Sequence, residues 1–199
     1  PGVGAHGGPL AAGPYGDQLQ PQSIAEVPAE GAPRVSYVER PGQFADGAAY
    51  SLRVPTYTIE SPGLGPLPAG LLISPRVAPA MIGMGLLAAI PEADLLARAD
   101  PDDSDGDGIS GRPNHVWDAA AGKPALGRFG WKANQPSVRQ QTAGAFLGDM
   151  GISSSLFTEQ NCPEGQAACA TAQTGGAPEI DDDLLADVVF YSSTLAVPA

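Results

Sequence analysis

Proline and glycine interrupt this chain so often that few stretches can form a long helix or strand. The sequence holds 26 glycines and 21 prolines among 199 residues, close to a quarter of the chain. Glycine loosens the backbone, and proline removes a hydrogen-bond donor. Hydrophobic residues nevertheless make up 43% of the chain, which is ordinary for a globular protein and argues against disorder. We therefore expect a folded, loop-rich α+β protein built from short elements.

The expected organisation is an irregular N-terminal wrap over residues 1–33 and a single compact domain over residues 34–199. Side-chain character alternates with a period of two in residues 34–40 and 49–60, which are rich in Val, Tyr and Thr. Residues 41–47 between them contain proline, glycine and aspartate, which favour turns. This pattern predicts a small β-hairpin over residues 34–60. Residues 79–199 are expected to form short helices around an acidic loop.

Four helices are predicted within that second region. The first two cover Pro79–Ile90 and Pro91–Ala99, the second with acidic residues in its first turn. The third begins after a Ser137 cap and ends at Gly151, and the fourth begins after an Asp181 cap. In the fourth helix, a stripe at helical spacing predicts the buried face: Leu184, Val188, Tyr191 and Leu195.

The net charge of −12 narrows the class of partner. Such a charge repels phosphate backbones, so we expect no nucleic-acid partner. The longest apolar run, residues 78–90, is shorter than the roughly 18–20 residues that a membrane-crossing helix needs. We therefore expect no membrane span.

The stretch DPDDSDGDGISGRPN, residues 100–114, indicates a calcium site. With Asp103 as position 1, Asp105 and Asp107 take positions 3 and 5, a glycine takes position 6, and Ile109 offers its carbonyl at position 7. Position 12 holds Asn114 in place of the usual glutamate, so Asp100, Asp118 or a distant side chain would complete the shell. The alternative is an unmetalled acidic turn, in which crowded carboxylates would repel one another.

Two cysteines, Cys162 and Cys169, stand in NCPEGQAAC. Their spacing is neither CxxC nor CxxCH, so the motif for covalent haem attachment is absent. Zinc would need further ligands, and the only histidines, His6 and His115, are far away in sequence. A short-range disulfide in an exported protein is favoured, and the alternative is two buried thiols in a cytosolic protein.

Three weaker signals leave alternatives open. Gly83-x-Gly85-x-x-Ala88 fits a dinucleotide fingerprint, but no buried strand precedes it, so close helix packing is favoured. In GRFGWKANQP, Trp131 is either an electron relay or a loop anchor. If it has the functional role, Arg128 or Lys132 would pair with carboxylates. The methionines, Met150 among them, are either soft haem ligands or core residues.

Four blocks of sequence, in this order, resemble the bacterial di-haem oxidoreductases of the peroxidase type, also called thiol-oxidoreductase-like. The blocks are FADGAAYSLRVPTYTIE, SPRVAPAMIGMGLLAAIPEADLLARADPDDSDGDGISGRPN, GRFGWKANQPSVRQQTAGAFLGDMGI and YSSTLAVPA. Members are similar to di-haem cytochrome c peroxidases, which are periplasmic or secreted, carry two haem c groups attached at CxxCH motifs, and hold calcium between the haem domains. The resemblance places this segment between the two attachment motifs.

This chain contains no CxxCH, so the resemblance implies the central, inter-haem part of such a protein. Its implied partners are the haem-bearing remainder of the parent and an electron-donor protein. Arg128, Trp131, Lys132 and Met150 become candidate haem neighbours, and Trp131 a candidate electron relay. The rival hypothesis is a non-enzymatic, calcium-stabilised scaffold or binding module within a larger assembly.

Overall fold

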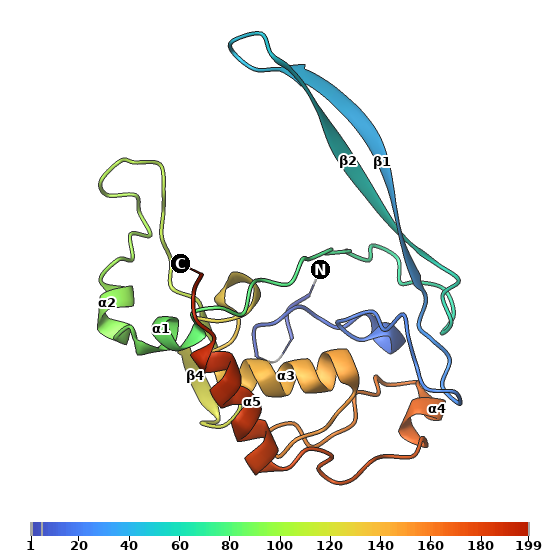
Figure 1. Ribbon diagram of the computed structural model, residues 1–199. Helices are drawn as coiled ribbons and strands as arrows, with labels where there is room; N and C mark the ends of the chain where they lie inside the picture. The colour runs from blue at the N-terminus through green and yellow to red at the C-terminus, as the bar shows by residue number, and fades with distance from the viewer. Residues whose placement is uncertain (1, 5, 199) are drawn as a thin grey trace. The chain divides into compact units, whose positions relative to one another are not determined.

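The structure, a computed structural model, describes residues 2–4 and 6–198 (Figure 1). In chain order its elements are η1 (Gly13–Tyr15), β1 (Ala32–Gln43), β2 (Ala49–Glu60), α1 (Met84–Ala89), α2 (Glu92–Leu96), β3 (His115–Asp118), β4 (Lys123–Leu126), η2 (Trp131–Ala133), α3 (Val138–Met150), α4 (Ala167–Ala170) and α5 (Asp182–Thr194). Most of them are short and are separated by loops and turns, as the proline and glycine content predicted, whereas β1, β2, α3 and α5 have 12 or 13 residues each. The α+β class is confirmed, with two small antiparallel hairpins and one disulfide.

The described residues fall into two compact units. The first consists mainly of residues 10–76 and 162–172, and the second mainly of residues 77–161 and 173–198. The expected wrap over residues 1–33 and single domain over residues 34–199 stay a prediction about domain organisation.

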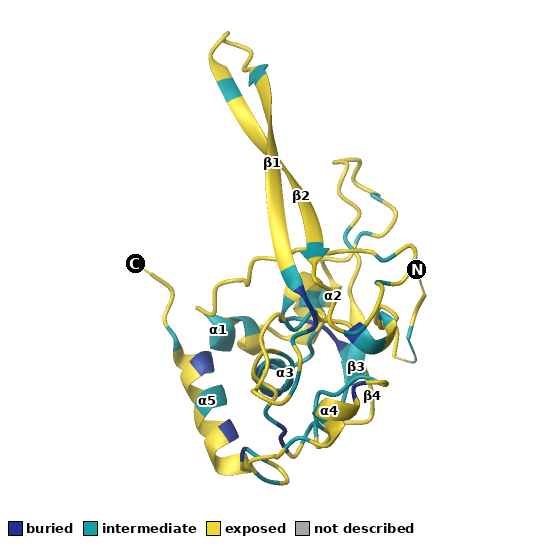
Figure 2. Ribbon diagram, turned by 90° about the vertical axis from the view of Figure 1, so that its right-hand side faces the viewer, coloured by how far each residue is buried: buried dark blue, intermediate teal, exposed yellow. Residues whose placement is uncertain are grey.

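The predicted hairpin is present in the first unit. Strands β1 and β2 pair antiparallel from Ala32↔Glu60 to Gln43↔Ala49, so β1 extends beyond the predicted Arg40 and includes part of the predicted turn. The turn itself is shorter, because the Phe44 amide already donates to the Ala48 carbonyl at 2.9 Å. Nearly every hairpin residue is exposed on both faces (Figure 2).

A buried carboxylate joins two distant segments within the first unit. Glu30 accepts hydrogen bonds from the Gln20 amide at 2.7 Å and from the side chain of Gln166 at 2.6 Å. Gln166 lies in the loop that the Cys162–Cys169 disulfide closes. The N-terminal segment is therefore tied to the disulfide loop by paired polar groups, which reduces the cost of burying them.

In the second unit, the first two helices are shorter than predicted. Helix α1 begins only at Met84, because Gly83 before it takes a left-handed conformation with φ of 71°. Residues 77–81 lie outside any regular element. Helix α2 ends at Leu96, and Pro91 lies at its N-cap and not inside the helix. Apolar residues at 78–83 predicted a longer helix, but prolines and the glycine limit it.

Helices α3 and α5 begin after the predicted capping residues. The Ser137 side chain accepts from the Gln140 amide, and Gly151 ends α3 with φ of 70°. The Asp181 carboxylate accepts from the Leu184 amide at 2.7 Å. These two helices pack together around a small core, whose fully buried members are Ala143, Ile180 and Leu185.

The predicted buried stripe on α5 is wrong. Leu184 and Tyr191 are exposed, Tyr191 by 64%, whereas Leu185 and Ser192 are 1% and 2% exposed. Figure 2 shows these buried positions along a helix that is otherwise largely exposed. Apolar residues occur on more than one side of α5, so helical spacing alone did not select the side that faces α3 and α1.

Candidate functional site

The acidic loop closes on itself through Asp100 and Gly111. The Asp100 amide donates to the Gly111 carbonyl at 2.9 Å, and the two residues form an isolated antiparallel bridge. Inside this loop, Gly106 and Gly108 have φ of 73° and 84°, and Asp103 also has a positive φ, of 51°. These left-handed positions bend the chain back repeatedly, and glycine adopts them without steric cost.

Three carboxylates converge in the loop. One oxygen from each of Asp100, Asp103 and Asp105 lies within 4.8 Å of the other two. Oxygens that share one calcium ion at 2.3–2.6 Å can lie up to about 5 Å apart, so this spacing fits a single ion. The donor set is all oxygen, which also fits calcium, although six to eight oxygens are needed in total.

Backbone amides already orient two of these side chains. The Asp103 carboxylate accepts from the Gly108 amide at 3.1 and 3.2 Å, and Asp105 accepts from the Asp107 amide at 3.2 Å. Hydrogen bonds from the amide and then the hydroxyl of Ser104 lower the pKa of Asp100 below its ordinary value. These hydrogen bonds fix the direction of all three side chains, and those from Ser104 favour the charged form of Asp100.

The other predicted ligands lie outside this cluster of described residues. Asp107 accepts from the Ile109 amide at 2.7 Å. The Asn114 side-chain amide donates to the carbonyls of Lys132 and Ala133, and Asp118 accepts from amides of its own turn. Numbering the loop as a calcium motif thus selected two members of the cluster, Asp103 and Asp105. The third member is Asp100, which was named from the sequence only as a candidate to complete the calcium shell.

The aromatic and basic segment forms a tight turn beside the loop end. Phe129 is buried and its amide donates to the Gln135 carbonyl at 3.0 Å, which closes the turn. Within η2, Lys132 and Ala133 take left-handed φ values of 56° and 51°. The buried aromatic residue of this turn is therefore Phe129, whereas Trp131, the predicted relay or loop anchor, is 43% exposed.

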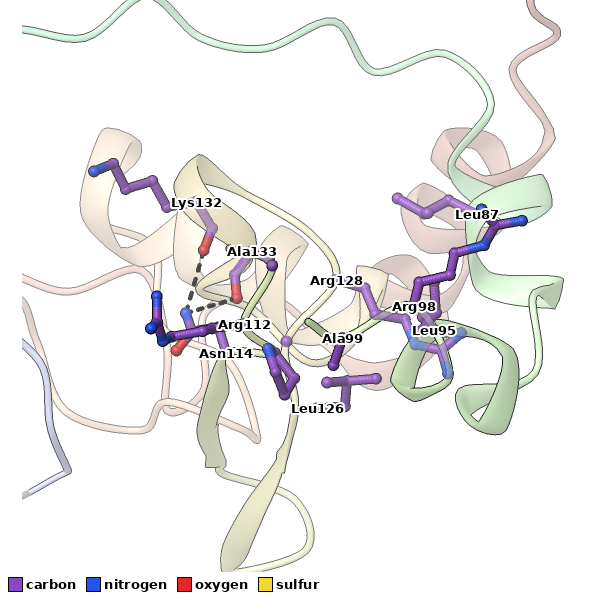
Figure 3. A pocket seen from close by; sticks show the side chains of 13 residues that line it. Leu87, Leu95, Arg98, Ala99, Arg112, Asn114, Leu126, Arg128, Lys132 and Ala133 are labelled. Atoms are coloured by element: carbon purple, nitrogen blue, oxygen red, sulfur yellow. Dashed lines mark hydrogen bonds between the residues drawn. The ribbon is translucent and has the colours of Figure 1, made fainter. Parts of the chain in front are cut away.

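A pocket of about 370 Å³ lies between this turn, the loop end and helices α1 and α2 (Figure 3). Its basic lining residues are Arg98, Arg112, Arg128 and Lys132, and its apolar side chains include Leu87, Leu95 and Leu126. Two of these residues, Arg128 and Lys132, were candidates from the sequence. Arg98 and Arg112 were missed, because they lie 14 residues apart in chain segments that only folding brings together.

Two further candidates lie apart from the pocket lining. Met150, at the end of α3, is 64% exposed and so is not a core methionine. Cys162 and Cys169 form a disulfide, which confirms that prediction. With both cysteines paired and no CxxCH in the sequence, the residues of this chain do not fit covalent haem attachment.

The dinucleotide fingerprint has no structural support. No strand precedes Gly83 and Gly85 in the described part of this region, and the helix they open has only six residues. A Cβ atom on Gly85 would collide with the backbone of α5, so this glycine allows close helix packing. None of the helices in the described residues has the length and apolar character that a membrane crossing requires.

Comparison with known proteins identifies one family. The model of the family described as "di-haem oxidoreductase, putative peroxidase" matches residues 67–199. No curated protein and no solved structure matches the chain. The match includes the acidic loop, the pocket, the aromatic turn and the disulfide, and it excludes the β1/β2 hairpin.

Proposed function

Because this chain belongs to the di-haem oxidoreductase family, we propose that it is the central, calcium-binding portion of an exported c-type oxidoreductase with peroxidase-like electron transfer. The observation that carries the proposal is the convergence of Asp100, Asp103 and Asp105 inside the family-matched region. Calcium there would order the loop and the residues that follow it.

The calcium proposal rests on charge and geometry together. Three carboxylates within 4.8 Å repel one another unless a cation compensates them. Amides from Gly108 and Ser104 reduce that repulsion but cannot replace a divalent ion. Backbone carbonyls such as that of Ile109, together with water, would supply the remaining oxygens. Magnesium is less suitable, since it demands a near-ideal octahedron and retains its water.

Haem would be held by the remainder of the parent protein. A bound haem c supplies an iron that exchanges single electrons with a donor or a peroxide. The contribution of this chain would be surface that the haem-bearing remainder contacts: the exposed indole of Trp131, the side chain of Met150, and the cations Arg128 and Lys132. Trp131 is the proposed electron relay, because its aromatic ring is accessible at the surface, 43% exposed, in the same turn as the buried Phe129.

Export is supported by the disulfide. Disulfides persist in oxidising compartments and are rare in the cytosol, so Cys162–Cys169 favours the periplasm or the extracellular space. An electron-donor protein would then be found in the same compartment.

The test uses the complete gene product that contains this chain. Its intact mass, visible spectrum and metal content are measured after purification from an exported preparation. A Soret band, two haem masses and about one calcium per chain support the proposal. A haem-free product overturns the oxidoreductase assignment, and a product with haem but without bound calcium overturns the calcium assignment alone.

The β1/β2 hairpin favours a second candidate function. Its two 12-residue strands are exposed on both faces, and a two-stranded sheet is marginal without a covering partner. A calcium-stabilised scaffold module would use this hairpin as an arm that binds other subunits. In that case the purified product would contain calcium but no haem.

A further inference from the structure

Basic side chains gather in one place in this acidic protein. Four of its ten lysines and arginines line the pocket described above: Arg98, Arg112, Arg128 and Lys132. The chain has 22 acidic residues, yet none of them is among the 13 residues of the pocket lining. In Figure 3, Arg98 lies on one side of the pocket, and Arg112 and Lys132 lie on the other, with the Lys132 side chain extended outward. A site with positive charge on two sides favours an anionic ligand.

The internal partners of these cations are neutral. Arg128 donates to the carbonyls of Ala88 and Ile90, at 3.2 and 2.6 Å, and so fixes the end of α1. Arg112 donates to the Ser110 hydroxyl at 2.9 Å and to the Pro101 carbonyl. Neither guanidinium is neutralised by these contacts, although both are held in place.

The remaining two cations have no side-chain partner among the described residues. The ion pairs recorded there are Arg34–Glu60, Arg53–Glu39 and Arg139–Asp182, all outside the pocket. The carboxylate cluster lies on the adjoining loop, but no recorded ion pair joins it to Arg98 or Lys132. These two side chains can therefore turn toward a ligand without breaking an existing contact.

The pocket also offers apolar surface. Of the leucines in its lining, Leu126 is buried, and Leu87 and Leu95 are half-buried. The volume of about 370 Å³ lies within the range of roughly 300–1,000 Å³ that is usual for small-molecule sites. Arginine pairs with carboxylates through two parallel hydrogen bonds, and the leucines suit an organic body between them.

We propose that this pocket binds a dicarboxylate whose two charged groups flank an apolar body. Arg98 would hold one carboxylate, Lys132 and Arg112 the other, while Arg128 keeps the wall in place. Two sources carry this chemistry: a free organic dicarboxylate, or the two propionates of a haem held by the parent protein. Binding of haem propionates rests on the proposed function and would deepen it. Binding of a free dicarboxylate does not depend on the proposed function.

The test is a calorimetric titration of the complete, as-purified gene product with terephthalate, a planar ring with a carboxylate at each end, at low and high salt. Terephthalamide, which has the same shape without charge, is the ligand control. The variant is Arg98→Gln/Lys132→Gln, because neither side chain makes an ion pair within the described part of the chain. Lys123→Gln, an exposed lysine outside the pocket, is the control variant. Thermal unfolding verifies that both variants fold.

Binding of terephthalate but not terephthalamide, weakened at least about tenfold in the double variant and unchanged in Lys123→Gln, supports a free dicarboxylate. If terephthalate does not bind because propionates fill the pocket, the double variant lowers the haem midpoint potential relative to Lys123→Gln, since removed cations favour the ferric state. If neither terephthalate binding nor a shift in potential separates the two variants, the proposal is wrong. A haem-free product would refute the oxidoreductase function, while the terephthalate titration would still decide the pocket.

Discussion

Gly85 lies so close to Ser193 that a Cβ atom on Gly85 would collide with the Ser193 carbonyl oxygen. Gly85 lies in α1 and Ser193 in α5, so the absence of a side chain at this position allows the two helices to touch. The contact is with backbone, which cannot rotate away as a side chain would. The close approach thus explains the glycine without any nucleotide.

Substitution of Gly85 is expected to separate α1 from α5. Gly85→Ala should lower the free energy of unfolding by about 1–3 kcal/mol, because overpacking forces the backbone to shift. Chemical denaturation measures the loss. Gly144→Ala is the matched control, since its new Cβ would meet nothing nearer than 4.0 Å inside α3. That control should be neutral or stabilising by about 0.5–1 kcal/mol; equal stability of both variants would contradict the packing argument.

Glu179 should make the second unit sensitive to acid. Hydrogen bonds from the amides of Ser153 and Gly175, and then from the Gln160 side chain, lower the pKa of Glu179 from 4.5 to about 2. A lowered folded pKa stabilises the protein above the ordinary value, and the stabilisation is lost as the pH falls from about 4.5 toward 2.

Glu179→Gln should therefore be less stable than the native protein at pH 7, by roughly 1–3 kcal/mol, because a charged acceptor is lost. The difference should shrink as the pH falls from about 5 to about 2, where the native carboxylate becomes protonated. Denaturation at several pH values measures it. Glu159→Gln, an exposed carboxylate nearby, is the control and should show a small, pH-independent difference. A constant difference for Glu179→Gln would refute the assignment.

The proposed calcium site predicts effects of different size for two aspartates of the loop, Asp105 and Asp107. Asp105→Asn removes charge from the three-carboxylate cluster and should weaken calcium binding at least about tenfold. Asp107→Asn lies outside the cluster and keeps an oxygen for the Ile109 amide, so its effect should be smaller. Calcium titration of both variants, after chelation, measures this difference. Stronger loss in Asp107→Asn would favour the ligand set numbered from the sequence.

Trp131 should affect electron transfer without affecting stability. Because its ring is 43% exposed, Trp131→Phe should change the free energy of unfolding by less than about 1 kcal/mol. If Trp131 is the relay, the same variant of the haem-loaded parent should transfer electrons between haems more slowly, as stopped-flow spectroscopy would measure. Trp117→Phe is the control, since Trp117 stacks on His6 with ring centroids 4.2 Å apart. Unchanged transfer in Trp131→Phe would leave Trp131 a surface residue only.

Local patterns in the sequence were sufficient for features that depend on neighbouring residues. Ser137 and Asp181 cap their helices because each side-chain oxygen reaches an amide three residues ahead. Alternation in residues 34–60 predicted the hairpin, since strand pairing follows from period-two chemistry and a turn. The cysteine spacing favoured a short-range disulfide, which is present. The β3/β4 hairpin was missed, because its four-residue strands contain too little alternation to stand out.

The sequence by itself determined the family, the loop-rich class, the helix caps, the hairpin and the acidic composition of the loop. Only the tertiary structure decided which side of α5 is buried, because that choice depends on the surfaces of α3 and α1. It also brought Asp100 into the cluster in place of Asp107, since the bridge to Gly111 closes the loop there. It gathered Arg98, Arg112, Arg128 and Lys132 around one pocket. Local hydrogen bonds can be inferred from spacing, whereas contacts between distant segments form only when the whole unit packs.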